Sequence, residues 1–271
     1  MGNTTRHRFG PTLVRSTHDY LFLLQALYAK SAAVGGPKMM AQVAVSFPGR
    51  PTPIHGFPQK LFDFEYPAPG DPDLAREIAE LVKPQWVGLD RDQWGIDHGT
   101  WSVLAHMYPD ADIPVLQLSI NALKPMEYHL DLAARLAPLR ERGVMIVASG
   151  NVVHNLQTLQ WREADLAYDW AERFDDAVVE QLARDPADIL RLQDHADYKL
   201  AVPTPDHFIP LLYTAGLATA ENTVLEPLLR GYSMGSISMS CYGLGADIEL
   251  RKDPACAAKL PTGVPPDQTN M

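Results

Sequence analysis

The chain has 271 residues with 23 basic and 33 acidic side chains, which gives a formal net charge of −10. Apolar residues make up 46% and charged residues 21%, a globular composition that excludes a disordered or fibrous chain. The acidic excess argues against a nucleic-acid partner, because phosphate contacts need clustered Lys and Arg, and two cysteines cannot build a disulfide framework or a Cys-rich zinc site.

The first predicted elements alternate between helix and strand. Residues 19–30 have apolar side chains at helical spacing and end before Gly35-Gly36-Pro37, so they are predicted as a helix. Residues 39–47 are predicted as a strand. Residues 71–83 are predicted as a helix with Asp71 as its N-cap and Pro72 at its first position.

The alternation continues in the second half of the chain. Residues 113–120 and 144–149 are short, continuous apolar runs, which are typical of strands buried on both faces. Residues 126–143 are predicted as an amphipathic helix kinked at Pro138, residues 164–184 as a further helix, and residues 236–244 as the last strand.

Alternating strands and helices predict an α/β fold, here a single three-layer αβα domain with a central mixed sheet. Residues 245–271 are rich in proline and are expected to form a tail. The N-terminus has no apolar segment of the secretory kind, and no run of about 20 apolar residues occurs, so a cytoplasmic protein without membrane contact is expected.

Three histidines stand where an α/β fold presents side chains to a ligand. His154 follows the 144–149 strand in its carboxyl-end loop, where crevices of open α/β sheets form. His207 would lie in the first turn of a helix capped by Thr204, and His98 lies between Asp97 and Gly99. Taken singly, His154 is more often a loop histidine bonded to the backbone, and His207 is as plausibly a solvated first-turn residue. The alternative for His98 is a simple turn between two elements.

The order and spacing of six motifs resemble one enzyme family. The motifs are EYPAPGDP, DHGTW, MYPDADIPVLQLSI, SGNVVHNL, PTPDHFIPLLY and GSISM, and the resemblance runs from about residue 53 to residue 244. Together they resemble the 4,5-DOPA-dioxygenase branch of the class III extradiol dioxygenases, which are related to the protocatechuate 4,5-dioxygenase catalytic subunit. The resemblance implies a catalytic domain over residues 1–244 that cleaves a catechol next to its hydroxyls with O₂, using a non-haem metal.

Carried over by motif, the resemblance assigns His154 and His207 to the metal and active-site cluster. It places His98 near the substrate and oxygen, and it makes His154 or His98 the group that moves the catechol proton. Fe(II) is the expected metal, and Zn(II) is a possible occupant of the same site. Neutral imidazoles suit both ions. A monomer or a homodimer is expected.

The first 50 residues depart from the family pattern. Members carry one ligand in an early His-Gly-Ser-Pro stretch, for which His7 is the stand-in here, and another in a Ser-Ala-His-Trp stretch, where this chain has Ser46-Phe47-Pro48. His18 and His55 lie nearby but off the motifs. Four interpretations stay open: an active dioxygenase, a metal-poor binding or scaffold relative, a metal-dependent hydrolase in the same cleft, and an enzyme disarmed at its N-terminus.

Overall fold

The computed structural model describes residues 65–89, 96, 98–121, 123–163 and 165–245, together with the backbone of 8–9, 12–13, 20–25 and 42–45. Helices and strands alternate along most of this length, so the predicted α/β class is confirmed. The helices are α2 (Pro72–Leu81), α3 (His98–Met107), α4 (Met126–Leu136), α5 (Asp169–Arg184), α6 (Tyr198–Ala201) and α7 (Ile209–Ala220), with 3-10 segments η2 (Ala137–Arg142), η3 (Leu156–Thr158) and η4 (Pro186–Asp194).

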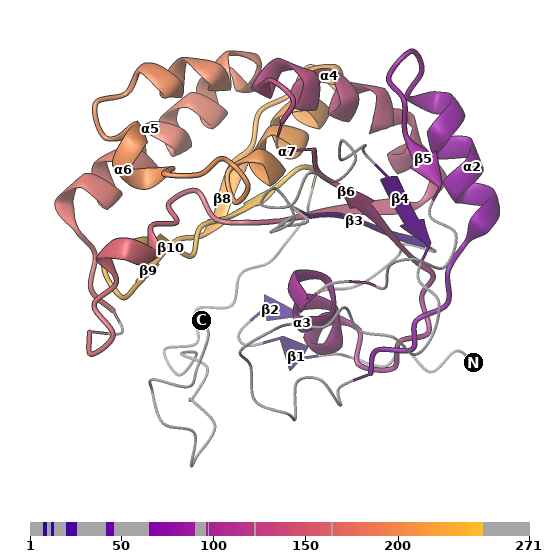
Figure 1. The fold of residues 1–271 in the computed structure, drawn as a ribbon, viewed down its shortest axis with the longest axis horizontal. Coiled ribbons are helices and arrows are strands. Elements are labelled where there is room, and N and C mark those ends of the chain that lie inside the picture. The colour runs from indigo at the N-terminus through magenta and orange to yellow at the C-terminus, as the bar shows by residue number, and fades with distance from the viewer. Residues whose placement is uncertain are drawn as a thin grey trace, which may run out of the picture.

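The main sheet has five strands in the order β5-β4-β6-β3-β7 (Figure 1). Its strands are β3 (Tyr20–Gln25), β4 (Gln42–Val45), β5 (Gly88–Leu89), β6 (Val115–Ser119) and β7 (Val144–Ser149). The sheet is mixed, because β3 runs parallel to both β6 and β7 while β4 is antiparallel to β6.

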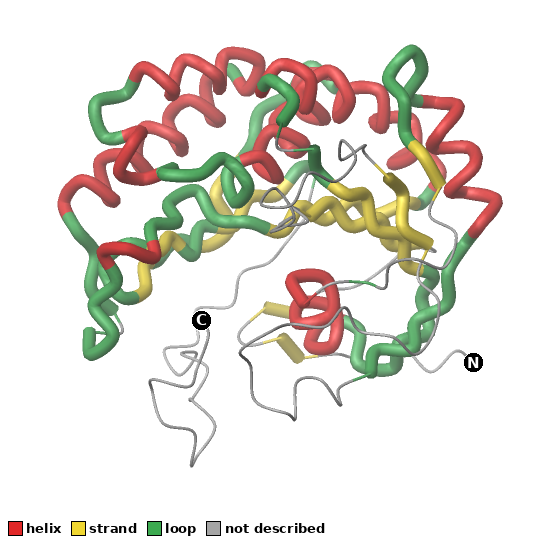
Figure 2. Tube along the Cα trace, in the orientation of Figure 1, coloured by secondary structure: helices red, strands yellow, loops and turns green. Residues whose placement is uncertain are grey.

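Three two-stranded pairs lie outside the main sheet (Figure 2). They are β1 (Arg8–Phe9) with β2 (Thr12–Leu13), β8 (Glu226–Leu229) with β11 (Cys241–Gly243), and β9 (Tyr232–Ser233) with β10 (Ile237–Ser238).

The predicted helix over residues 19–30 is wrong, because Tyr20–Gln25 is strand β3. This strand lies inside the sheet, between β6 and the edge strand β7. A strand covered on both faces needs a continuous apolar run rather than an alternating one, and such a run also fits a short stretch of buried helix. Only the pairing of β3 with two distant strands distinguishes the two structures.

The buried strands divide their side chains between two cores. Along β6, Leu116 and Leu118 join the large core, which is built around Leu132, Tyr213 and Leu217 of α4 and α7. The small core on the other face contains Val115 of β6 with Trp101, Leu104 and Tyr108 from α3 and its end. Figure 1 shows α4, α5 and α7 on one side of the sheet and α3 on the other.

Local signals fixed several element ends as predicted. The Asp71 side chain accepts hydrogen bonds from the backbone N–H groups of Asp73 and Leu74 and so caps α2, with Pro72 at its first position. Helix α4 ends at Leu136, and the chain tightens into η2 around Pro138 before Gly143 closes it with φ 79°. Strand β7 has the predicted bounds, Val144–Ser149.

Two other predicted elements are shorter or divided. Helix α5 begins at Asp169 rather than at residue 164. The predicted 236–244 strand is split into β10 and β11, which pair with β9 and β8 and not with the main sheet. No helix among the described residues is long and apolar enough to span a bilayer.

Candidate active site

The segment after β7 passes very close to the turn before α7. A Cβ atom on Gly150 would lie 2.3 Å from the backbone oxygen of His207 and 2.9 Å from Cγ of Pro210. The next backbone N–H, of Asn151, donates to the same His207 oxygen at 2.9 Å. Glycine therefore permits a backbone approach that no other residue allows here.

Residues 151–155 are then held along β10. The Val153 N–H donates to the Ser238 hydroxyl at 2.9 Å, and the Asn151 side chain donates to the Ser238 carbonyl at 2.8 Å. The Asn155 N–H donates to the Ser236 carbonyl at 3.1 Å. His154 forms an isolated antiparallel bridge with Ile237. The His154 backbone is thus fixed by a ladder of hydrogen bonds rather than left in an open loop.

The imidazole rings of His154 and His207 are stacked. Their centroids are 3.5 Å apart and the angle between their planes is 10°. Both residues are partly exposed. Two rings from segments more than 50 positions apart in sequence, in face-to-face contact and open to solvent, form the strongest candidate site among the described residues.

His207 is oriented by the residue before it. Asp206 is buried, and its Oδ2 lies 2.7 Å from Nδ1 of His207. Burial by itself would raise the pKa of Asp206, but its contacts with His207 and Thr204 lower that pKa to about 2. A carboxylate at Nδ1 favours the tautomer that carries its proton there, which leaves the Nε2 lone pair for a ligand.

His154 is held in its neutral form. Burial and, to a smaller extent, the adjacent His207 ring lower its pKa to about 4, although Asp206 opposes the shift. A neutral imidazole at physiological pH can accept a proton or bind a metal, whereas an imidazolium can do neither.

Helix α3 brings a third histidine to the same edge of the sheet. The Gly99 carbonyl lies 3.5 Å from the hydroxyl of Ser149, the last residue of β7. The Thr100 hydroxyl donates to the Gln117 side chain of β6 at 2.7 Å. His98 is the first residue of α3, so its backbone lies at the carboxyl end of β7, where the 150–155 segment also begins. Its side chain lies outside the described part of the structure, as does Asp97.

The predicted ligand His7 lies outside the described residues, as do His18 and His55. Within the described ranges, no group of three or more His, Cys, Asp or Glu side chains is placed to hold a metal ion. The pair offers imidazole nitrogens, which Fe(II) and Zn(II) both bind, but the lone pairs lie in two nearly parallel ring planes 3.5 Å apart, so one ring must turn before both can bind one ion. A closed site also needs more ligands than this pair provides.

The structure corrects one detail of the sequence analysis and adds two features. His207 lies in a turn, since α7 begins only at Ile209, and Thr204 contacts the Asp206 side chain instead of capping a helix. No role was predicted for Asp206 or for the Ser236 and Ser238 pair. An acidic residue directly before a candidate histidine was the only available signal for Asp206.

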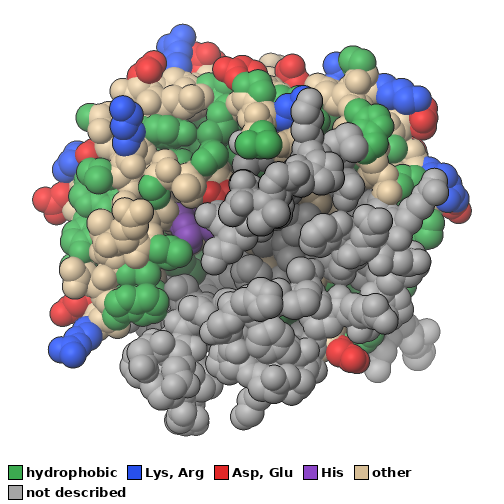
Figure 3. Space-filling view, in the orientation of Figure 1, with side chains coloured by type: hydrophobic (Ala, Val, Ile, Leu, Met, Phe, Trp, Pro, Cys, Tyr) green, Lys and Arg blue, Asp and Glu red, His purple; other side chains and the backbone are tan. Residues whose placement is uncertain are grey.

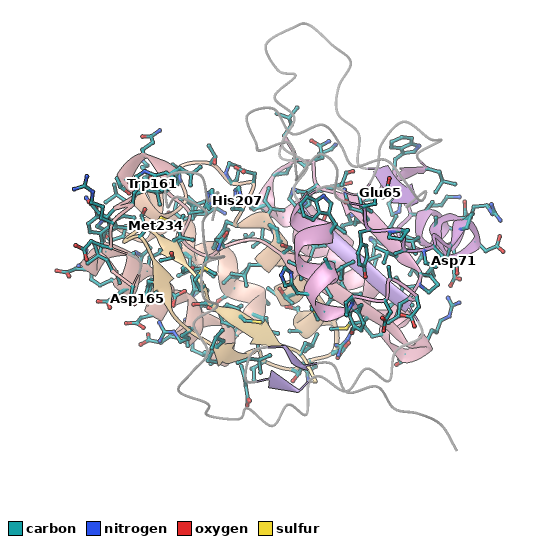
Figure 4. The ribbon with its side chains drawn as sticks, turned by 90° about the horizontal axis from the view of Figure 1, so that it is seen from below. Glu65, Asp71, Trp161, Asp165, His207 and Met234 are labelled. Carbon is teal, nitrogen blue, oxygen red and sulfur yellow. The ribbon has the colours of Figure 1, made fainter. Side chains whose placement is uncertain are left out.

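Two views show the surroundings of the site. In Figure 3 a histidine side chain is visible on the face of the molecule, bordered by hydrophobic side chains. In Figure 4 His207 lies between the region that carries Trp161 and Met234 and the region that carries Glu65 and Asp71.

Comparison with known proteins gives consistent results. A family model described as the catalytic LigB subunit of aromatic ring-opening dioxygenase matches residues 30–244. An Escherichia coli K12 protein named 4,5-DOPA dioxygenase extradiol is 45% identical over 202 residues, 72% of this chain and 74% of that protein. A Beta vulgaris protein of the same name is 36% identical over 194 residues, 70% of this chain and 71% of that protein. The crystal structure of an uncharacterized Escherichia coli K12 protein superimposes with a TM-score of 0.68 at 36% identity, covering 83% of this chain and 85% of that one.

Proposed function

The chain belongs to the family of the catalytic LigB subunit of aromatic ring-opening dioxygenases, and from that membership we propose a non-haem metal-dependent extradiol dioxygenase. Its substrate would be a catechol, DOPA-like or related, and the product a ring-opened semialdehyde. The observation that carries the proposal is the stacking of the His154 and His207 rings at 3.5 Å, because two motifs of the family meet there.

In this proposal both stacked histidines are metal ligands, and each has its own surroundings. His207, with the Asp206 carboxylate beside its Nδ1, presents Nε2 as a metal ligand, and His154 and His7 complete the set of metal-binding side chains. The metal, Fe(II) with Zn(II) as the alternative, would supply Lewis acidity and, as iron, the electron transfer that O₂ requires.

The proton of the catechol hydroxyl needs an acceptor, and two histidines are proposed for this task. His154 can accept it only when it is not bound to the metal, because an imidazole has one lone pair; without a bound metal its lowered pKa keeps it neutral at pH 7. His98 starts α3 at the same edge of the sheet and is the second candidate. Either ring would return the proton to the oxygen of the opened product.

One observation favours a second candidate function. Where members of the family carry a ligand in a Ser-Ala-His-Trp stretch, this chain has Ser46-Phe47-Pro48, so a metal-poor relative that acts as a binding or scaffold protein is the alternative proposal. The two functions differ in whether O₂ is consumed.

The deciding experiment is oxygen uptake with a panel of catechols after anaerobic loading with Fe(II). We expect uptake together with the yellow semialdehyde product, and at least a hundredfold lower rate for His154→Ala. The matched control is His106→Ala, which changes an exposed histidine of α3 and should keep the rate. No uptake with any catechol, and no difference between the two variants, would favour the scaffold function.

The proposal extends to the whole domain. We place the catalytic domain at residues 1–244 and a tail at 245–271, in a cytoplasmic monomer or homodimer. A three-layer αβα arrangement is supported by β3, which is contacted by both α3 and α7, helices that belong to different cores.

A further inference from the structure

A carboxylate is fully buried in helix α5, and the proposed chemistry makes no use of it. Asp175 has no exposed surface. Burying a carboxylate costs free energy of folding unless cations or hydrogen-bond donors surround it. The partners of Asp175 therefore indicate its role.

All of these partners come from one C-terminal segment, residues 230–240. The Arg230 guanidinium donates to Asp175 Oδ2 from Nη2 at 2.7 Å and from Nε at 3.2 Å. The Ser240 hydroxyl lies 2.8 Å and 2.9 Å from the two carboxylate oxygens. The Tyr232 hydroxyl lies 3.3 Å from Oδ2. Arg230 also reaches the exposed Asp176 at 2.6 Å.

The charge of Arg230 is held by the same contacts. Burial alone would lower the pKa of its guanidinium, but the bonds to Asp175 and Asp176 raise it above its ordinary value. Asp175 therefore binds the Arg230 cation, which precedes β9 in the chain, and the Ser240 hydroxyl, which follows β10.

The segment that Asp175 holds is also the one that holds His154. Between Tyr232 and Ser240 lie Ser236 and Ser238, which bond the backbone of residues 151–155. Ile237 bridges His154 itself. Two hydrogen-bonded connections thus run in series, from α5 to the 230–240 segment and from that segment to the His154 backbone.

We propose that Asp175 is a positioning residue for His154, acting through Ser240 and the β9–β10 pair to keep the His154 ring stacked on His207. The inference concerns a histidine of the proposed function, but it is a statement about the metal-free protein. It can therefore be tested without metal or substrate, and its failure would not be confused with a failure of the proposed activity.

The test is NMR of metal-free protein with labelled histidine. A stacked ring shifts its neighbour's resonances, so His207→Ala gives the position of the His154 signals without stacking. We expect Asp175→Asn to move the His154 signals toward that reference. The matched control is Asp176→Asn, the same change one residue along, at a carboxylate that binds the same arginine, and it should leave the His154 signals in place.

Amide exchange separates positioning from general stability. In Asp175→Asn we expect about tenfold faster exchange at the Val153, Asn155 and Ser238 amides, and unchanged protection in α7. Ser240→Ala is a milder change that removes the hydroxyl bonded to Asp175 and should speed exchange at the same amides by a smaller factor. If Asp175→Asn does not fold, Ser240→Ala is the variant that tests the proposal.

Three results would overturn the proposal. The His154 signals of folded Asp175→Asn, or of Ser240→Ala when that variant decides, could coincide with those of the unmodified protein. Exchange could rise equally in α7, which would mean a general loss of stability. Asp176→Asn could act as strongly as Asp175→Asn, which would assign the effect to Arg230 alone.

Discussion

A single methyl group at Gly150 should separate the two site histidines. The Cβ of Gly150→Ala would lie 2.3 Å from the His207 oxygen, whereas ordinary contact begins at 3.4 Å. The two backbones must therefore move apart by about 1 Å, since a well-packed interior has no free space to absorb the clash. The contact atom is backbone, so no side-chain rotation can relieve it.

The energetic effect combines three contributions. Overpacking of this kind costs about 1–3 kcal/mol. The Asn151 N–H bond to the His207 oxygen, now 2.9 Å, is stretched or lost, at about 1 kcal/mol. Alanine also reduces the conformational entropy of the unfolded chain, which offsets about 0.4–1 kcal/mol of this loss. This gain applies because Gly150 does not have a positive φ, which alanine would resist. We expect a net loss of roughly 1–4 kcal/mol in the free energy of unfolding.

The displacement should matter more for ligand binding than for folding. Metal–ligand distances tolerate only about 0.2 Å, so a shift of about 1 Å between the His154 and His207 segments spoils a shared ion. We expect Fe(II) or Zn(II) affinity to fall by at least about tenfold, which corresponds to about 1.4 kcal/mol.

Urea unfolding and metal titration of Gly150→Ala measure the two effects. Gly231→Ala is the matched control, because its Cβ would have no heavy atom within 4 Å. If Gly150→Ala unfolds at the same urea concentration as the control and binds metal as tightly as the unmodified protein, the close approach described above does not hold the site together.

Three further predictions concern packing, pH and the tautomer of His207. Gly216→Ala in α7 should lower the free energy of unfolding by about 1–2 kcal/mol, because the new Cβ would lie 2.6 Å from the backbone oxygen of Leu130. The loss is expected despite the higher helix propensity of alanine. A urea midpoint equal to that of Gly231→Ala would contradict this prediction. Burial lowers the pKa of His129 from 6.5 to about 4, so between pH 6.5 and pH 4 the unfolded chain binds a proton at His129 that the folded chain does not. The free energy of unfolding therefore falls as the pH drops through this window, by about 3 kcal/mol at pH 4. His129→Gln should flatten the corresponding pH slope of urea unfolding, Tyr213→Phe should keep it, and a slope unaffected by His129→Gln would rule out this origin. Asp206→Asn should weaken Zn(II) binding by about tenfold to a hundredfold in a competition titration with the fold intact, and equal affinity would show that the carboxylate does not orient His207.

Much of the fold followed from the sequence because its signals are local. The cap of α2 at Asp71, the break of α4 near Pro138 and the bounds of β7 each depend on a few neighbouring residues. These three features share one property, which is that the residues that decide them are close together in the chain. His154 and His207 were predicted as a pair on different grounds, namely the order and spacing of six motifs that resemble one family.

Tertiary structure decided the features that depend on distant partners. Tyr20–Gln25 is a strand because β6 and β7 flank it, and its own apolar run did not distinguish strand from helix. The predicted 236–244 strand pairs outside the main sheet, where β9 and β10 brace His154. The stacking of two imidazoles at 3.5 Å needs a close backbone approach at Gly150 that no sequence pattern encodes. The sequence therefore indicated which residues are candidates for the site, and long-range packing determined which of them meet.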